Sequence, residues 1–366
     1  MYDRYIESLT APADLCAAVT VLVPTNGRTE QLNRCIQSIV NNRYTCFRVV
    51  VLDQTEDTRR LDIRDNRNVE HVFVSQKGKA RALNFGLNFA DTPFIALTDD
   101  DTVVDENWIQ RGVDALCCDK GIGLIFGSVN PAPEPGDDSF IPSFMPQEAK
   151  EIVRASAIAI PGVGMGANMF ARTQAVRSIG GWDAALGPGS HFRSGDDWDL
   201  AFRMAIRGFK VGVSPGPAVT HWGSRSLSNG AASTLIYNNF YGVGAGAAKF
   251  VRSGELAIVP AAAKTLAKCA WDVFSSVVHS GRPRHARRFL ALSRGFREGW
   301  TVPIDTSARK FVDTAMPHES RQGDSNSRAE SQKANPFRRR GCQRCGIAAS
   351  GETHGTSSSR ADAPAT

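Results

Sequence analysis

Short apolar segments alternate with helical patterns through the first third of the chain, and this alternation limits the possible folds more than any other feature. Four segments rich in apolar and β-branched residues are expected to be strands: 19–23 (VTVLV), 47–53 (FRVVVLD), 69–75 (VEHVFVS) and 93–101 (PFIALTDDD). Apolar residues three and four positions apart predict three helices: 32–40, 80–90 and 108–118. Because a parallel pair of strands needs a crossover connection, this alternation predicts an α/β fold. We expect a Rossmann-like, mainly parallel sheet flanked by helices.

Acidic residues follow two of these strands directly. Asp53 ends the second, and Asp99, Asp100 and Asp101 end the fourth. Ligands of such sheets bind outside the carboxyl ends of the strands, so these side chains should line one crevice. Three adjacent carboxylates repel one another, and a solvated acidic turn is one interpretation. The alternative is a Mg²⁺ or Mn²⁺ site, in which Asp99 and Asp101 point to the same side of an extended turn.

Two further positions between residues 120 and 225 carry groups that can do chemistry. Asp196, Asp197 and Asp199 cluster in GDDWDL (195–200), where a helix is predicted to begin. Acidic residues there either complement the helix dipole or supply a general base. His221 ends a predicted strand and is either a structural histidine or a metal ligand.

Taken in order, these features resemble glycosyltransferase family 2, the inverting nucleotide-sugar transferases of GT-A fold. The matching segments are VTVLVPTNGR, VVVLDQTED, GKARALNFGL, IALTDDD, GANMFAR with GGWD, GDDWDLAFR and PAVTHW, over residues 19–223. The resemblance implies an enzyme that moves a sugar from a nucleotide-diphosphate sugar to an acceptor hydroxyl. The acceptor would be a glycan or a lipid-linked molecule, as in polysaccharide or glycolipid biosynthesis.

The resemblance also implies which residues bind the donor and a metal. The donor-binding set is Pro24, Thr25, Arg28, Asp53, Lys79, Arg81, Asn84, Asp99 and Asp100. Within it, Asp53 matches the aspartate that binds the base, and Asp100 is the middle residue of the D-x-D motif, near the ribose or sugar. Asp101, Asp99 and His221 match the residues that hold the divalent cation, Mn²⁺ or Mg²⁺.

The segment GDDWDL resembles the GEDxDL motif of the family. Asp197 matches the aspartate proposed as catalytic base, and Asp196 stands beside it where the family commonly has Glu. Asp199 and Arg203 match a structural pair near the start of the helix. The resemblance assigns three residues to the acceptor side: Trp182, Asp183 and Trp198.

Two other functions remain open at this stage. A catalytically inactive GT-A-like protein that binds a nucleotide sugar would keep Asp53 and the crevice but not the base. A nucleotidyltransferase shares the strand–helix pattern and a metal-binding aspartate, but usually has a glycine-rich, basic loop after the first strand. The segment 24–31 (PTNGRTEQ) resembles such a loop poorly. The presence of both the D-x-D motif and Asp197 favours the glycosyltransferase.

The chain is expected to have four parts. They are an N-terminal extension (1–18), a GT-A domain (19–225), a helical region (226–304) and a basic tail (305–366) that is expected to be disordered. The GT-A domain divides into a nucleotide-binding half (19–118) and an acceptor half (119–225). The positive charge is concentrated at the end of the chain, because residues 281–366 contain 16 Lys and Arg against 8 Asp and Glu.

The helical region has two interpretations, a set of packing helices or a peripheral contact with anionic membrane. The second rests on basic residues beside apolar ones: Arg282, Arg284, Arg287 and Arg288 with Phe289, Leu290, Leu292 and Trp300. The sequence contains no clear transmembrane segment or signal peptide, so we expect a cytoplasmic protein, peripheral at most on the inner face of the membrane. No recognisable motif predicts specific nucleic-acid binding.

Overall fold

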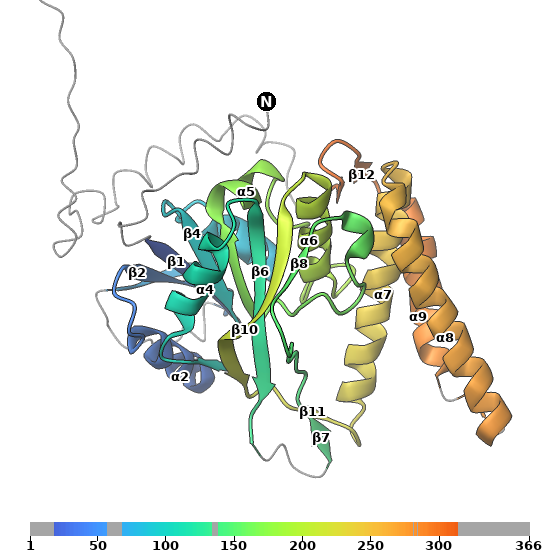
Figure 1. Cartoon of the computed structure of the whole chain (residues 1–366). Helices are drawn as coiled ribbons and strands as arrows, with labels where there is room; N and C mark the ends of the chain where they lie inside the picture. Colours follow the sequence, from blue (N-terminus) through green and yellow to red (C-terminus); the bar gives the residue numbers. More distant parts are fainter. Residues whose placement is uncertain (1–17, 57–67, 134–137, 281, 284, 314–366) are drawn as a thin grey trace, which may run out of the picture. The chain divides into compact units, whose positions relative to one another are not determined.

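A mixed β-sheet forms the centre of the described part of the chain (Figure 1). The computed structural model describes residues 18–56, 68–133, 138–280, 282–283 and 285–313. Nine strands of these residues pair in the order β3-β2-β1-β4-β9-β6-β10-β5, and β8 pairs with β10. Their bounds are β1 (Val19–Thr25), β2 (Phe47–Asp53), β3 (Val69–Phe73), β4 (Phe94–Thr98), β5 (Thr102–Val104), β6 (Ile122–Pro131), β8 (Lys150–Ile152), β9 (Asn168–Arg172) and β10 (Lys210–His221).

The parallel half of the sheet agrees most directly with the sequence pattern. β1 pairs in parallel with β2 and β4, and β2 pairs in parallel with β3. Every residue of β1 and β4 is buried, as expected for strands that are covered on both faces. β9 is antiparallel to both β4 and β6, while β10 is parallel to β6. The predicted fold class, a mainly parallel α/β sheet flanked by helices, is confirmed.

Helices in the same part of the chain follow the strands in sequence. They are α2 (Thr29–Val40), α3 (Lys79–Gly86), α4 (Trp108–Cys117), α5 (Thr173–Ser178) and α6 (Asp196–Ile206). The predicted apolar side of α2 is buried at Leu32, Cys35 and Ile39. α4 lies so close to β9 that a Cβ atom at Gly112 would be 2.3 Å from the ring of Phe170. Glycine at that position therefore permits the helix to approach the sheet.

One strand is irregular. β10 continues from Lys210 to His221, so His221 ends a strand as predicted. Its pairing with β6 shifts register between Val213 and Ala218. Pro215 and Pro217 lie in this interval and have no N–H for the sheet, so the irregularity takes the form of a bulge within one strand.

A helical extension follows the sheet, as predicted. It consists of α7 (Ala231–Arg252), α8 (Val259–Ser280) and α9 (Ala286–Thr301). The shorter elements are β7 (Ser139–Phe140), β11 (Arg225–Ser226), η2 (Ala155–Ala157), η3 (Leu256–Ile258), β12 (Ile304–Asp305) and β13 (Lys310–Phe311). Glycines allow α7 and α9 to pack backbone against backbone: a Cβ atom at Gly295 would be 2.0 Å from the carbonyl oxygen of Tyr241.

A fully buried ion network joins α7 to the domain that contains the sheet. Lys249 of α7 donates to Asp183 at 2.7 Å and also contacts Asp199 of α6. Arg203 donates to Asp199 at 2.8 Å, which confirms the predicted structural pair. Burial alone would raise the pKa of Asp199, but Arg203 and Lys249 lower it below its ordinary value. The network therefore remains ionised in the core.

Two expectations for the end of the chain need correction. The tail was predicted to begin at residue 305, but β12 and β13 form a hairpin there and Phe311 packs against Phe192. On the side of α9 predicted to contact a membrane, Leu292 is buried, whereas Leu290 and Trp300 are exposed. Residues 1–17 and 314–366, and Arg284 of the same prediction, lie outside the described residues. Within the described residues, we find no helix whose length and apolar character would let it cross a bilayer.

We predict that replacing Lys249 with Met destabilises the protein strongly. The substitution leaves Asp183 and Asp199 buried without their shared cation, which should lower the free energy of unfolding by about 3–5 kcal/mol. Urea unfolding followed by circular dichroism measures the change. Lys268→Met is the matched control, because the side chain of Lys268 is 74% exposed and its ion pair is worth at most about 1 kcal/mol. Equal losses in the two variants would contradict the proposed importance of the network.

Candidate active site

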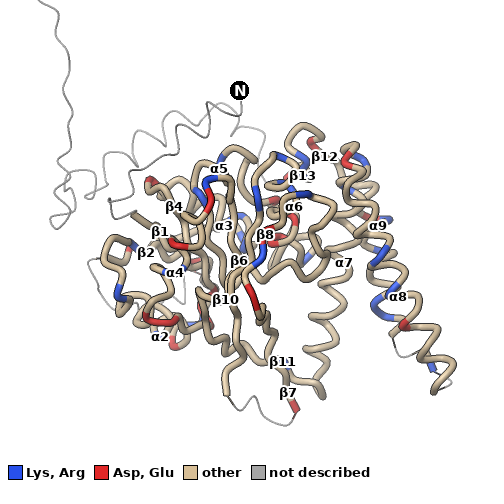
Figure 2. The backbone as a smooth tube through the Cα atoms, in the orientation of Figure 1, with Lys and Arg blue, Asp and Glu red and all other residues tan. Residues whose placement is uncertain are grey.

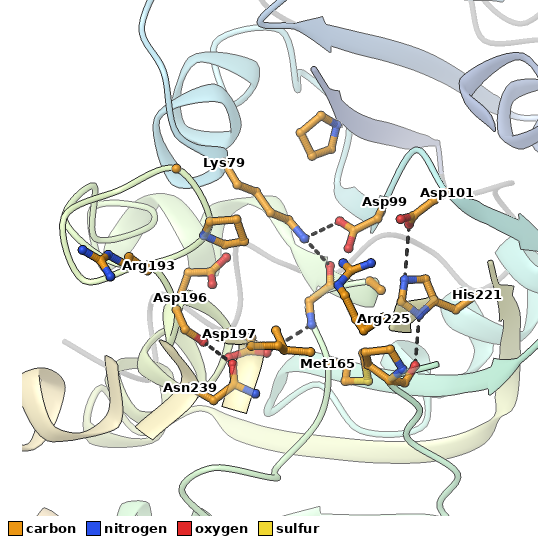
Figure 3. Close-up of a pocket in the computed structure, with 18 of the residues that line it drawn as sticks. Lys79, Asp99, Asp101, Met165, Arg193, Asp196, Asp197, His221, Arg225 and Asn239 are labelled. Atoms are coloured by element: carbon orange, nitrogen blue, oxygen red, sulfur yellow. Dashed lines mark hydrogen bonds and ion pairs between the residues drawn. The ribbon is translucent and has the colours of Figure 1, made fainter. Parts of the chain in front are cut away.

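A cavity of about 780 Å³ lies at the carboxyl ends of β1 and β4. Eleven of the residues singled out in the sequence line it: Pro24, Thr25, Arg28, Lys79, Asp99, Asp100, Asp101, Asp196, Asp197, Trp198 and His221. Figure 3 shows Asp99 and Asp101 on one side of the cavity and Asp196 and Asp197 on the other, with the side chain of Lys79 between the two pairs. The fold thus brings together segments that are about a hundred residues apart in the chain.

Each of the three consecutive aspartates has a different partner. Asp99 forms an ion pair with Lys79. Asp100 accepts a hydrogen bond from Thr25 at 2.6 Å and pairs with Arg28 at 2.9 Å. Asp101 pairs with the other terminal nitrogen of Arg28. These two cations offset the repulsion between the carboxylates.

Burial and charge act differently on the two inner aspartates. Burial raises the pKa of Asp100 to about 6, although Arg28 and the hydroxyl of Thr25 oppose the shift. Burial alone would also raise the pKa of Asp101, but the contact with His221 and the charge of Arg28 lower it below its ordinary value. Asp101 therefore stays ionised at neutral pH.

Asp101 and His221 face each other in a way that suits a cation. Nδ1 of His221 lies 2.9 Å from the carbonyl oxygen of Pro142, which fixes a proton on Nδ1. Nε2 then points at Oδ1 of Asp101 across 3.3 Å. Two lone pairs at that distance need a proton or a metal ion between them. Although burial opposes it, Asp101 raises the pKa of His221 and so favours a proton there; the same two groups would fit a divalent cation in its place, with the hydrogen bond to Pro142 orienting the histidine.

The predicted set of three metal ligands is not assembled. Asp99 forms an ion pair with Lys79 instead. Among the described residues, no three His, Cys, Asp or Glu side chains are close enough to hold an ion. The physical reason is charge, because Lys79 is buried beside Asp99 and supplies the cation that this carboxylate needs. Only Asp101 and His221 of the predicted ligands are neighbours.

The second acidic pair begins α6. Gly195, in a left-handed conformation with φ of 96°, precedes Asp196 and Asp197. Oδ2 of Asp197 accepts a hydrogen bond from the backbone N–H of Gly166 at 3.3 Å. Burial raises the pKa of both carboxylates, and the charge of Lys79 opposes the shift in each case. A buried carboxylate with a raised pKa is suited to accept a proton.

Five predicted site residues do not line the cavity, and the structure gives them other partners. Arg81 forms a bidentate pair with Asp313, at 2.8 Å and 3.0 Å. The amide of Asn84 exchanges two hydrogen bonds with the backbone of Trp182, at 2.8 Å and 2.9 Å. The structure thus gives Arg81 and Asn84 structural contacts, while the donor-binding roles of both stay predictions.

The other three are also held by internal contacts. Trp182 is buried in the core, and Asp183 accepts from Lys249 and from the N–H of Phe311, so neither side chain is available to an acceptor. Asp53 is buried beside the cavity rather than in its wall. Its carboxylate accepts from the N–H of Thr55 and contacts His71 at 2.9 Å.

Several cavity residues carried no signal in the sequence. Arg225, in the short strand β11, and Arg193, which has a left-handed φ of 64°, bring two further cations to the wall. α7 contributes Asn239, whose side chain accepts a hydrogen bond from Ser194 at 2.9 Å. None of the three lies in a pattern of charge or spacing. They are brought to the cavity by the helical extension and by loops.

Known glycosyltransferases resemble this chain in sequence. The family model described as glycosyltransferase-like family 2 matches residues 17–234. Glycosyltransferase AglE of Haloferax volcanii is 23% identical over 203 residues. These residues are 53% of this chain and 63% of that relative, so the chain spans less than two thirds of its length.

Two solved structures also match. Residues 1–349 of TarS from S. aureus match with a TM-score of 0.50 at 11% identity, over 78% of this chain and 81% of that one. The mannosyltransferase PcManGT of Pyrobaculum calidifontis, in complex with GDP-Man and Mn²⁺, matches with a TM-score of 0.47 at 17% identity, over 82% of this chain and 92% of that one. At 11% identity, the likeness to TarS shows a shared fold.

We predict that Asn84→Ala lowers stability without weakening nucleotide binding. The loss of two partly buried hydrogen bonds to Trp182 should cost about 1–3 kcal/mol in the free energy of unfolding. The affinity for a nucleoside diphosphate, measured by isothermal titration calorimetry, should stay within about twofold, because a purely structural residue has no contact to lose. A large loss of affinity in a folded variant would support the donor-binding role.

Proposed function

The chain belongs to glycosyltransferase-like family 2, and from this membership we propose that it transfers a sugar from a nucleotide-diphosphate sugar to an acceptor hydroxyl. The observation that carries the proposal is the meeting of two acidic groups in one cavity, Asp99–Asp101 and Asp196–Asp197. A binding protein needs only the first group. The buried second group supplies a base beside the place where a donor would lie, which favours a transferase.

The donor is proposed to bind between the ends of β1 and β4. Arg28 and Lys79 bring positive charge to this side, and Arg225 faces it from β11. A diphosphate carries negative charge next to Asp101, so a cation is required at their contact. Asp101 and His221 would hold a divalent cation, which when bound would neutralise charge on the leaving nucleoside diphosphate. We propose Mn²⁺ or Mg²⁺ as the ion.

Transfer is proposed to occur in one displacement that inverts the anomeric carbon. The oxygen of the acceptor hydroxyl forms the new bond to that carbon, while the bond to the diphosphate oxygen breaks. Asp197 accepts the proton of the hydroxyl, as in other general base catalysis. Asp196 stands beside it, with a pKa that burial and the charge of Asp197 raise to about 7, and Lys79 limits how far burial raises the pKa of both.

The acceptor is proposed to be a glycan or a lipid-linked molecule. The cavity wall is partly apolar: it includes Phe140 of β7, Ile141 and Phe144 from the residues that follow β7, and Leu235 and Ile236 from α7. Trp198, at the start of α6, is the one predicted acceptor-side residue in the wall. Sugar rings and lipid chains both pack against apolar walls of this kind.

Replacing the proposed base should separate catalysis from binding. Asp197→Asn keeps the size of the side chain but cannot accept the proton, so sugar transfer should fall by about 10²-fold to 10⁴-fold. Binding of a nucleoside diphosphate, measured by calorimetry in the presence of Mn²⁺, should change little. Asp196→Asn is the matched control and should retain more activity. A loss of both binding and transfer in Asp197→Asn would instead indicate a structural role.

The same assignment determines the direction of the pH dependence. Asp197 works when it is ionised, and burial raises its pKa, so the rate should fall as the pH decreases through that raised value. Because Lys79 opposes the rise, Lys79→Met should move the acidic limb of the kcat profile to higher pH. An unmoved limb would mean that Asp197 does not limit the rate.

Metal dependence tests the other acidic group. Chelation with EDTA should abolish transfer, and Mn²⁺ or Mg²⁺ should restore it. Asp101→Ala should weaken metal-dependent binding of a nucleoside diphosphate at least about tenfold. Glu106→Ala provides the control, since this carboxylate is exposed and pairs with Arg43. Full activity in EDTA would overturn the metal assignment while leaving that of Asp197 intact.

A further inference from the structure

Exposed apolar side chains are concentrated on the helical extension. Among the described residues, 17 large apolar side chains are exposed, and ten of them lie between residues 256 and 300. This interval is only about a sixth of the described chain. Exposed apolar residues scattered singly are normal, but a concentration of this kind marks an interaction surface.

Most of these side chains belong to one side of α8, the "α8 stripe". It consists of Val259, Leu266, Trp271, Phe274, Val277 and Val278. Successive members lie seven, five, three, three and one positions apart, which at 3.6 residues per turn places all six within about 140° of the helix circumference. Trp271 is 65% exposed and Phe274 58%. The opposite side of α8 packs inward at Cys269, which is buried. The stripe is therefore an outer surface, about 29 Å long at 1.5 Å per residue.

Basic residues accompany the α8 stripe. α8 itself contains two Lys and one Asp, and residues 281–301 add six Arg and one Glu, of which Arg287 and Arg288 lie over Tyr237 and Phe240 of α7. Lys264 and Lys268 of α8 are exposed beside the stripe. The acidic residue of α8, Asp272, is turned toward Lys268 and Arg288 at 3.4 Å and 3.8 Å. Figure 2 shows Lys and Arg along α8 and α9. The surface thus combines apolar length with positive charge.

We infer that α8 lies on the surface of an anionic lipid bilayer, with the α8 stripe inserted among the lipids. An apolar, Trp-containing side next to Lys and Arg is the arrangement that binds such a surface, because apolar burial and attraction to anionic headgroups add. A second protein chain would bury the stripe too, but the positive charge of this region favours a negatively charged partner. The membrane contact that the sequence predicted on α9, where Leu290 and Trp300 are exposed, is thereby extended to α8.

α8 packs against a segment that lines the cavity, so a membrane contact through α8 would also affect where the cavity lies. Thr265 of α8 donates a hydrogen bond to the carbonyl of Ile160 at 2.5 Å, and the next two residues, Pro161 and Gly162, line the cavity. Attachment through α8 would therefore hold one wall of the cavity near the bilayer. The inference itself rests on the surface of α8 and stands whether or not the cavity transfers a sugar.

The experiment is sedimentation of the full chain with vesicles. Vesicles of phosphatidylcholine with phosphatidylglycerol should bind the protein, and pure phosphatidylcholine should bind it at least about tenfold less, since each basic residue near an anionic surface contributes about 1 kcal/mol. Binding should also weaken at about 1 M salt, where the Debye length is about 3 Å. No binding to anionic vesicles would overturn the inference.

Two pairs of substitutions locate the contact. Trp271→Ser with Phe274→Ser should lower vesicle binding at least about tenfold, and Lys264→Glu with Lys268→Glu should have a similar effect. Phe73→Ser with Met145→Ser is the control, because these side chains are 50% and 53% exposed away from α8. Equal binding by the control and by the Trp271 and Phe274 variant would contradict the assignment to α8.

Two further measurements distinguish vesicle binding from changes in stability and in self-association. Thermal unfolding should be nearly unchanged in all these variants, since exposed substitutions alter stability by about 0.5 kcal/mol or less. Sedimentation equilibrium compares the association state of the wild type with that of the Trp271 and Phe274 variant. If the substitutions dissociate a dimer and leave vesicle binding unchanged, the stripe is an interface between copies of the chain and the inference is wrong. Asp197→Asn should bind vesicles as the wild type does.

Discussion

The ammonium group of Lys249, buried between Asp183 and Asp199, is the interaction on which the arrangement of the candidate site depends. Asp199 lies in the first turn of α6, the same turn that presents Asp196 and Asp197 to the cavity. Lys249 belongs to α7, whose residues also line the cavity. A charge in the core is stable only with its partners in place, so α6 and α7 must pack in one relative position. The helical extension is thus part of the site.

The same rule, that a buried charge needs a partner, explains how the cavity is organised. Arg28 and Lys79 neutralise aspartates that would otherwise repel one another. Asp101 is the aspartate whose remaining oxygen faces the histidine, at 3.3 Å. For the nucleotide-diphosphate donor proposed above, Arg28 and Lys79 are the cations that stand beside these aspartates. Asp101 and His221 are the pair proposed to hold a metal ion at its diphosphate.

The sequence predicts the part of the fold that depends on local pattern. The alternation of apolar segments with helical patterns predicts β1 to β4, and it places the acidic residues after β4 at the carboxyl ends of the parallel strands, where the cavity lies. The sequence does not distinguish side chains that line the cavity from side chains with structural contacts when both occur in one segment. In α3, Lys79 lines the cavity, whereas Arg81 binds Asp313 and Asn84 binds the backbone of Trp182. Those partners lie about 230 and 100 residues away, so no local periodicity reveals them. Arg193 and Arg225 were missed for the same reason.

The extension also shows what an amphipathic pattern alone leaves undecided. In sequence, α9 has the stronger contrast between basic and apolar residues, and the pattern places Leu292 on an apolar outer side. Packing decides otherwise: glycines of α7 and α9 bring the two backbones together, and this contact buries Leu292. α8 has apolar residues on both sides and can bury only one of them against the domain. The other apolar side stays exposed, because one helix cannot pack both of its sides against the core. This exposed side, the α8 stripe, is the one for which we infer a partner outside the described chain.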